Sequence, residues 1–196
     1  MARKTSTRQK RPQIPTIIGA GITEQWHFTH LQRLKDYRVK IRPRYFGTET
    51  ANGIGKKIEE VLRDDGIAIC VFDADVSSWN EAERRKWDSI RKKYKNSNSV
   101  VLCDSLPSIE YWFLLHYENT NRYFGTSKSV TEELRNFVPQ YDKSEKFLQQ
   151  EKWVADMIDG DRLEEARNRA ETLGTNGESY TNVHKAISII DNAKNK

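Results

Sequence analysis

Two aspartates, Asp73 and Asp75, follow a strongly apolar segment and are separated by a single alanine. Residues two apart on an extended strand point to the same side, so the two carboxylates are expected to lie side by side. Neighbouring carboxylates repel each other, and a divalent cation relieves that repulsion. Mg²⁺ in particular accepts one or two carboxylates and completes its coordination with water and substrate phosphate. The pair is therefore a candidate metal site. The alternative is that Asp73 ends the strand and Asp75 caps the following turn.

Two glutamates stand at comparable places in the chain. Glu24 follows the first apolar run, in the first turn of an expected helix. Glu110 follows a later apolar run, one turn inside a helix that Pro107 is expected to open. Each has helix capping as its alternative role, because the helix dipole favours an acid near the N-terminus. The carboxyl ends of parallel strands meet at one edge of a sheet. The sequence therefore also predicts that these glutamates share a site with the two aspartates.

The elements that must position these acids alternate regularly. Apolar runs at residues 16–20, 67–72 and 99–103 are typical of buried strands, and residues 38–46 alternate as a half-exposed strand does. Each run is followed by helical spacing of apolar residues, over residues 23–34, 52–63, 80–94 and 107–116. Strands that alternate with helices predict an α/β fold, with a mostly parallel sheet flanked by helices.

After residue 120 the pattern is helical. Residues 129–137, 144–158, 162–173 and 180–193 have helical spacing. We therefore expect three parts: a basic flexible tail over residues 1–13, an α/β core over residues 14–120, and a helical extension over residues 121–196 that packs on the core.

The net charge of +5 and the pI near 9.1 come from the beginning of the chain. Residues 1–13 hold five bases and no acid, whereas residues 14–196 carry equal numbers of bases and acids. A charge-balanced folded part argues against a plain nucleic-acid-binding module, which normally needs several bases on one face. The tail is the part expected to attract a polyanion without regard to sequence.

Composition excludes several other classes. Cys70 and Cys103 lie in apolar runs, so a disulfide framework and a Cys-rich zinc site are excluded. His27 and His30 have a spacing that suits a metal, but no third ligand is obvious nearby. No apolar run approaches the roughly 18 residues of a membrane span. The first residues lack the apolar stretch of a secretory signal, so a cytoplasmic location is expected.

Three segments resemble the RloB-like family, small proteins encoded beside an ATPase in bacterial defence loci. The family pattern has E-G-x-T-E and an aromatic after the first strand, F-D-x-D at the end of a later strand, and then S-N-P-x-F-E-x-W-x-L-L-H-[FY]. The matching segments here are residues 20–24 with Phe28, residues 72–75, and residues 105–117. The resemblance covers about residues 15–117 well. The third motif is the most specific, because its proline, glutamate, tryptophan and histidine keep their spacing.

The resemblance implies a Toprim-like fold, in which an acid after the first strand and a D-x-D bind Mg²⁺ or Mn²⁺ for phosphodiester chemistry. It implies a nuclease of DNA or RNA in anti-phage defence, which acts with an ABC-type or AAA-like ATPase of the same locus. Asp73, Asp75 and Glu110 are then the expected metal ligands, and Glu24 and Glu110 the catalytic acids. The bases expected to contact phosphates are Arg44, Lys56 and Lys57. The oligomeric state is left open.

Two positions depart from the family pattern. Ala20 stands where the family has its first acid, and an alanine can neither hold a metal nor move a proton. Either Glu24 takes over that role, or the chain is a catalytically degenerate subunit that binds a ligand, nucleic acid or partner protein without cleavage. A third alternative is that Ala20 was introduced by engineering to inactivate the chain. Leu106 stands where the family has asparagine, which removes a polar side chain near Glu110.

Overall fold

A computed structural model describes residues 13–42, 50–75, 81–175 and 178–194. Within these ranges the chain forms a five-stranded sheet in the order β2-β1-β3-β4-β5. The strands are β1 (Thr16–Gly19), β2 (Lys40–Arg42), β3 (Ala68–Asp73), β4 (Val100–Leu106) and β5 (Tyr180–Thr181). The first four are parallel, and β5 is antiparallel to β4. The predicted α/β fold with a mostly parallel sheet is confirmed.

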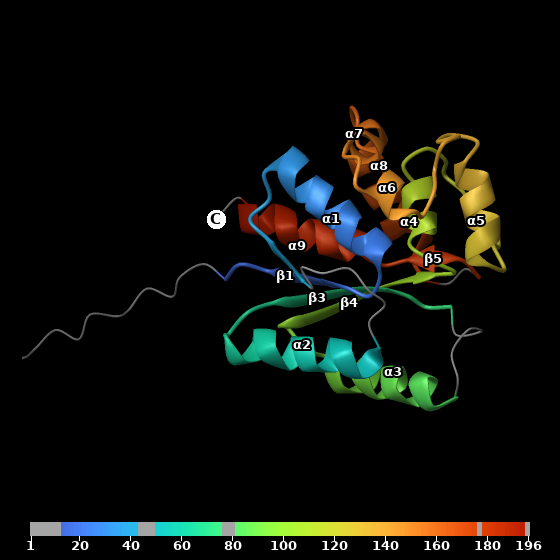
Figure 1. Ribbon diagram of the computed structural model, residues 1–196. Helices are drawn as coiled ribbons and strands as arrows, with labels where there is room; N and C mark the ends of the chain where they lie inside the picture. Colours follow the sequence, from blue (N-terminus) through green and yellow to red (C-terminus); the bar gives the residue numbers. More distant parts are fainter. Residues whose placement is uncertain (1–12, 43–49, 76–80, 176–177, 195–196) are drawn as a thin grey trace, which may run out of the picture.

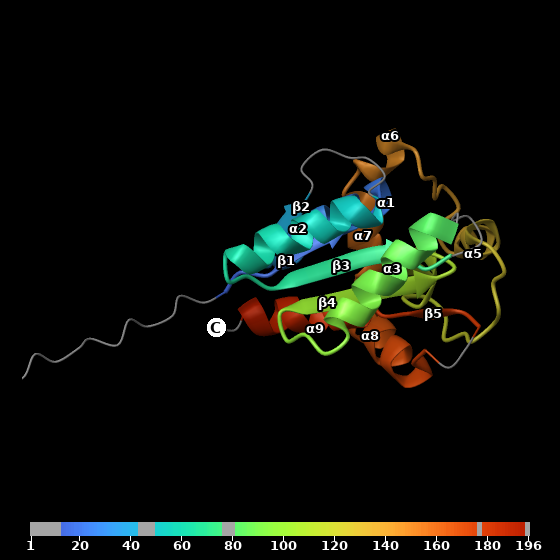
Figure 2. The ribbon, with the colours of Figure 1, turned by 90° about the horizontal axis from the view of Figure 1, so that it is seen from below.

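Helices cover both faces of the sheet (Figures 1 and 2). One face carries α2 (Ala51–Arg63) and α3 (Glu81–Tyr94). The other carries α1 (Ile22–Lys35) and α9 (Val183–Lys194), with the shorter helices gathered beside them. These shorter helices are α4 (Glu110–Leu114), α5 (Ser127–Leu134), α6 (Glu145–Leu148), α7 (Lys152–Met157) and α8 (Arg162–Leu173).

The central strand β3 explains why its sequence is a continuous apolar run. Successive side chains of a strand point to opposite faces. Ile69 and Val71 therefore enter the core under α1, whereas Cys70 and Phe72 enter the core under α2 and α3. Helices cover both faces of the sheet, so both sets of side chains are buried. The alternation of apolar and polar residues that is typical of a half-exposed strand is therefore absent.

The C-terminal segment differs from its predicted all-helical form at residues 180–181. Tyr180 and Thr181 form β5, and the helix begins only at Val183. The cause is Asp104 on β4, whose carboxylate accepts hydrogen bonds from the Tyr180 hydroxyl at 3.0 Å and the Asn182 amide at 2.8 Å. The Asp104 carbonyl also accepts the Asn182 N–H at 2.8 Å. These contacts hold the segment extended against the sheet edge.

The helix predicted over residues 144–158 is divided into α6 and α7. The Leu148 carbonyl at the break is engaged by side chains. It accepts the indole N–H of Trp153 at 3.2 Å and lies 2.8 Å from the His30 ring nitrogen. Tertiary contacts thus replace the helical bonds that would have made the segment continuous.

The helix expected from Pro107 starts three residues later, at Glu110. Residues 107–109 precede the helix, and the Ile109 N–H donates to Asp73 Oδ1 at 2.9 Å. No helix within the described ranges is long and apolar enough to cross a membrane.

Candidate functional site

A cavity of about 650 Å³ lies beyond the carboxyl ends of β1, β3 and β4. It brings together Glu24, Asp73, Asp75 and Glu110, the four acids that the sequence predicts for one site. They come from the start of α1, the end of β3 and the start of α4. The cavity wall consists of Ala20, Gly21, Ile22, Thr23, Glu24, Thr50, Phe72, Asp73, Asp75, Glu83, Trp87, Pro107, Ile109, Glu110, Ser127 and Lys143.

Glu24 is almost completely buried, with 4% of its surface exposed. Its side chain folds back over the turn before α1, where a methyl group added to Gly21 would lie only 2.7 Å from Glu24 Oε2. Burial raises the pKa of Glu24 to about 7. Hydrogen bonds from backbone N–H groups oppose this rise, and the negative charge of Glu110 adds to it. A carboxyl with this pKa is divided between its two protonation states near neutral pH.

Asp73 connects β3 to the beginning of α4. Its Oδ1 accepts the Ile109 N–H at 2.9 Å. Burial raises the pKa of Asp73 well above its usual range, and the negative charges of Glu24 and Glu110 raise it further. Asp75, two residues further on, is partly exposed and lines the same cavity.

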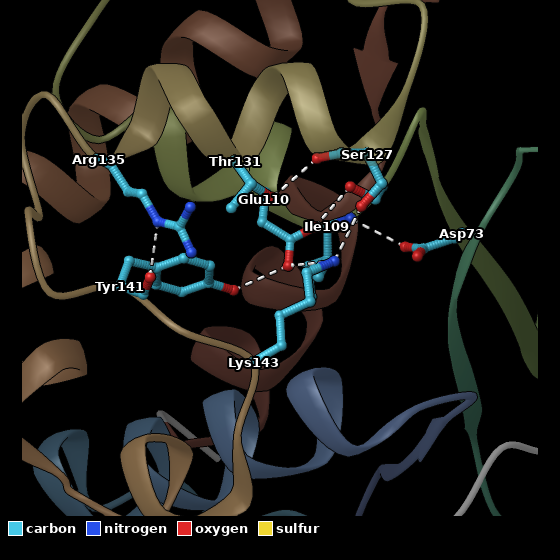
Figure 3. A network of polar contacts seen from close by, with 9 residues as sticks. Asp73, Ile109, Glu110, Ser127, Thr131, Arg135, Tyr141 and Lys143 are labelled. Carbon is cyan, nitrogen blue, oxygen red and sulfur yellow. Dashed lines mark hydrogen bonds and ion pairs between the residues drawn. The ribbon is translucent and has the colours of Figure 1, made fainter.

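Glu110 is fully buried and held on both oxygens. Oε1 accepts the Tyr141 hydroxyl at 2.8 Å and pairs with Lys143 Nζ at 2.9 Å. Oε2 accepts the Ser108 hydroxyl at 2.5 Å. Burial and the charge of Glu110 raise the pKa of Tyr141 well above its usual range, so the phenol remains a donor. This network fixes the orientation of the Glu110 carboxylate (Figure 3).

Lys143 contributes the positive charge of the site. It reaches in from the segment between α5 and α6, and its Nζ donates to Ser127 Oγ at 2.9 Å as well as pairing with Glu110. Its charge also lowers the pKa of Glu24 and of Asp73, partly offsetting their burial. Lys143 is the only base in the wall that the described residues form.

Of the bases predicted to contact phosphates, Lys56 and Lys57 are not part of the wall that the described residues form. Arg44 lies outside the described residues. Lys56 lines a groove between α2 and α3, and Lys57 lines a separate hollow beside β2. Sequence reasoning missed Tyr141 and Lys143, which belong to a short polar stretch between two helices that has no motif or periodicity.

Behind the cavity lies a group of buried aromatic side chains that includes three buried histidines, His27, His30 and His116. Neither ring nitrogen of His27 has a hydrogen-bond partner among the described residues, and its ring lies 5.0 Å from that of Phe113. Burial lowers the pKa of His27 well below its usual range and that of His116 to about 4. His116 Nδ1 lies 3.0 Å from the Trp112 carbonyl. The rings of His27 and His116 are therefore neutral at pH 7.

The donor set of the cavity fits a hard cation that retains water. Across the described ranges, no group of three or more His, Cys, Asp or Glu side chains is close enough to hold a metal ion without rearrangement. Mg²⁺ and Mn²⁺ accept carboxylate oxygens, and Mg²⁺ is commonly bound through one or two carboxylates with water in the remaining positions. Burial raises the pKa of Glu24 and of Asp73, and neighbouring negative charges add to the rise, so the ionised forms of both lack full compensation by positive charge. A divalent cation would provide it.

The fold and the cavity define an α/β protein with an acidic site at the carboxyl edge of a parallel sheet. The chain belongs to the RloB-like protein family, whose family model matches residues 16–190. The match therefore extends well beyond residues 15–117 and includes the segment between α5 and α6 that carries Tyr141 and Lys143. No curated protein and no solved structure matches the chain.

Proposed function

We propose that this chain is a divalent-metal-dependent phosphodiesterase of the Toprim type that cleaves DNA or RNA. The observation that carries the proposal is the convergence of Glu24, Asp73, Asp75 and Glu110 on one cavity at the carboxyl edge of the sheet. The negative charges of Glu24, Asp73 and Glu110 add support, because burial and the repulsion among these three make the cavity a favourable place for a cation. The proposed nuclease role in anti-phage defence, with an ATPase partner, is what the family resemblance implies.

Asp73 and Asp75 are the proposed principal metal ligands, and Glu110 is the proposed third. Bound Mg²⁺ or Mn²⁺ would stabilise charge on the attacking and leaving oxygens of the phosphodiester. The hydrogen bonds from Tyr141 and Ser108 hold the Glu110 carboxylate in one orientation, which limits the rearrangement required on binding. Asp73 is held in a similar way through the Ile109 N–H.

Glu24 is the proposed general base. Its pKa of about 7 lets the ionised form accept a proton from water near neutral pH, and the resulting acid remains stable in the buried site. The water oxygen forms a bond to phosphorus, the ester P–O bond breaks, and the leaving oxygen takes a proton from solvent. Glu24 thereby takes the place of the acid that the family pattern has at the position of Ala20.

Cleavage assays on DNA and on tRNA with Mg²⁺ or Mn²⁺ test the proposal. Asp73→Asn removes a proposed carboxylate ligand of the metal while keeping the size of the side chain, and we expect a rate at least about 100-fold lower. Asp156→Asn is the matched control, because Asp156 is exposed on α7, pairs with Lys152 and lies outside the cavity wall. Equal rates for the wild type and Asp73→Asn would contradict this assignment of the metal site.

Ala20 favours a second candidate function, a catalytically degenerate subunit that binds nucleic acid, a ligand or a partner protein without cleavage. Ala20 lines the cavity and offers no donor to a metal or a proton. Ala20→Glu distinguishes the two functions. Cleavage that appears only in Ala20→Glu would favour the degenerate subunit, whereas cleavage by the wild-type chain would favour the enzyme.

A further inference from the structure

The acidic cavity already contains one positive charge of the protein itself, the ammonium group of Lys143. Lys143 Nζ lies 2.9 Å from Glu110 Oε1, and its charge acts on Glu24 and Asp73 as well. An ammonium in contact with a fully buried carboxylate stabilises it strongly, because an uncompensated buried charge is costly. Lys143 thus already supplies some of the compensation that a divalent cation would bring.

Lys143 is held in a way that allows its ammonium group to move away from Glu110. Its side chain is 43% exposed although its carboxylate partner is fully buried, so the lysine stem extends from solvent into the cavity. Lys143 belongs to the segment between α5 and α6 rather than to a helix or strand. Its second contact is a neutral hydroxyl, Ser127 Oγ, at 2.9 Å. A flexible stem with one charged partner can turn outward without unfolding an element.

We infer that Lys143 neutralises Glu110 in the metal-free protein and releases it when a divalent cation enters, so that lysine and cation compete for one carboxylate. The inference rests on the proposed metal-dependent function and adds a means of regulating it. Two positive charges at the same carboxylate repel each other, so the entering cation weakens the Lys143 ion pair. The competition keeps the metal-free cavity stable and lowers its affinity for the cation.

Calorimetric titration of the full chain with Mn²⁺ tests the competition directly. Lys143→Met keeps much of the side-chain length and removes the charge, so we expect Mn²⁺ to bind about tenfold more tightly. We also expect its metal-free form to unfold at a lower temperature than the wild type, and Mn²⁺ to raise that temperature by more. Lys143→Arg, which keeps the charge, should bind Mn²⁺ as the wild type does.

Lys146→Met is the matched control, because Lys146 is exposed on α6, three residues away, and lies outside the cavity wall. It should leave Mn²⁺ affinity unchanged. Ser127→Ala provides a second route if Lys143→Met folds poorly. It removes the hydroxyl that helps hold the ammonium, so Mn²⁺ should again bind more tightly, by a smaller factor.

The outcomes separate the inference from the function on which it rests. The competition is supported if Lys143→Met binds Mn²⁺ more tightly than the wild type does. It is also supported if Lys143→Met binds Mn²⁺ and the wild type does not. If the wild type binds Mn²⁺ and Lys143→Met binds equally or more weakly, the competition is wrong and the metal site stands. Weaker binding of an oligonucleotide at unchanged Mn²⁺ affinity would instead make Lys143 a phosphate contact and overturn the inference. Absence of Mn²⁺ binding in every variant would overturn the proposed function itself.

Discussion

At the scale of single residues, environment decides what each acid of the cavity can do. Glu24 and Asp73 are carboxylates at strand ends in the sequence, and that much is readable from residue type and spacing. Their raised pKa values follow from burial and mutual repulsion, which need the folded structure. The Lys143 contact with Glu110 joins residues 33 positions apart without a shared motif, so sequence reasoning could not have found it.

A methyl group added at Gly21 should alter the site without affecting the rest of the fold. Its backbone has φ −135°, which any residue adopts, so alanine is tolerated there without strain. The added methyl would lie 2.7 Å from Glu24 Oε2 and must displace that carboxylate. Under the proposed function, we expect Gly21→Ala to lower the cleavage rate at least about tenfold and to change the free energy of unfolding by less than about 1 kcal/mol.

Cleavage assays and urea unfolding check this expectation for Gly21→Ala. Gly55→Ala on α2 serves as the control, because its added methyl would meet only Ile90 Cδ1 at 3.9 Å. It should leave the cleavage rate unchanged. A rate for Gly21→Ala equal to that of the wild type would mean that the position of the Glu24 carboxylate does not matter for cleavage.

His116 should make the fold sensitive to acid. Its pKa is about 4 in the folded chain, lowered mainly by burial and far below the ordinary value of 6.5. Between these values the unfolded chain binds a proton that the folded chain does not. The stability is therefore complete above about pH 6.5 and is lost as the pH falls towards about 4, by roughly 3 kcal/mol. His27 acts in the same direction, whereas Glu24 acts in the opposite one.

The contribution of His116 can be isolated by comparison with His116→Asn, whose amide nitrogen takes the place of the ring Nδ1 and can still donate to the Trp112 carbonyl. Denaturant unfolding at about pH 7 and about pH 4.5 gives the free energy of unfolding of each chain. We expect the wild type to lose more of it than the variant, by roughly 2–3 kcal/mol. Equal losses in the two chains would rule out His116 as a source of acid sensitivity.

At the scale of elements, the order of strands and helices does most to build the site. Alternation of apolar runs and helical spacing was enough to predict the first four strands and the parallel sheet, because each pattern reflects burial within one element. The strand β5 and the break between α6 and α7 escaped prediction. Both depend on distant partners, Asp104 for β5 and His30 for the Leu148 carbonyl, that local periodicity does not encode.

Asp104 should hold β5 on the sheet. Asp104→Ala removes the acceptor of the Tyr180 hydroxyl and of the Asn182 amide, which lie at 3.0 and 2.8 Å. We expect a loss of about 1–3 kcal/mol in the free energy of unfolding, together with faster amide exchange at Thr181 and Asn182. Hydrogen exchange resolved by residue measures the local effect. Tyr180→Phe removes a single bond and should cost less, and exchange unchanged in Asp104→Ala would show that β5 is held by other contacts.

At the scale of the whole molecule, charge is distributed unevenly along the chain. The family match over residues 16–190 includes the sheet, the acids and the segment between α5 and α6 that supplies Tyr141 and Lys143. The net charge of +5 comes from residues 1–13, and the remainder is balanced. Residues 14–196 therefore form an acidic cavity without a net positive charge to draw a polyanion to it. Under the proposed function, attraction of nucleic acid falls to the basic residues at the beginning of the chain.

Deletion of residues 1–13 should therefore weaken binding of nucleic acid and make it less dependent on salt. Each base that neutralises a phosphate of duplex DNA releases counterions and adds about 0.9 to the slope of log K against log salt concentration. The segment holds five bases, so the deletion should reduce that slope by about 0.9 for every phosphate that the segment neutralises. Fluorescence anisotropy of a labelled duplex, measured over a range of KCl concentrations, gives both the affinity and the slope.

Replacing the five bases by glutamine keeps the length of the chain and should have the same effect as the deletion. A slope that is unchanged in both variants would move the phosphate-binding bases into residues 14–196, despite their balanced charge.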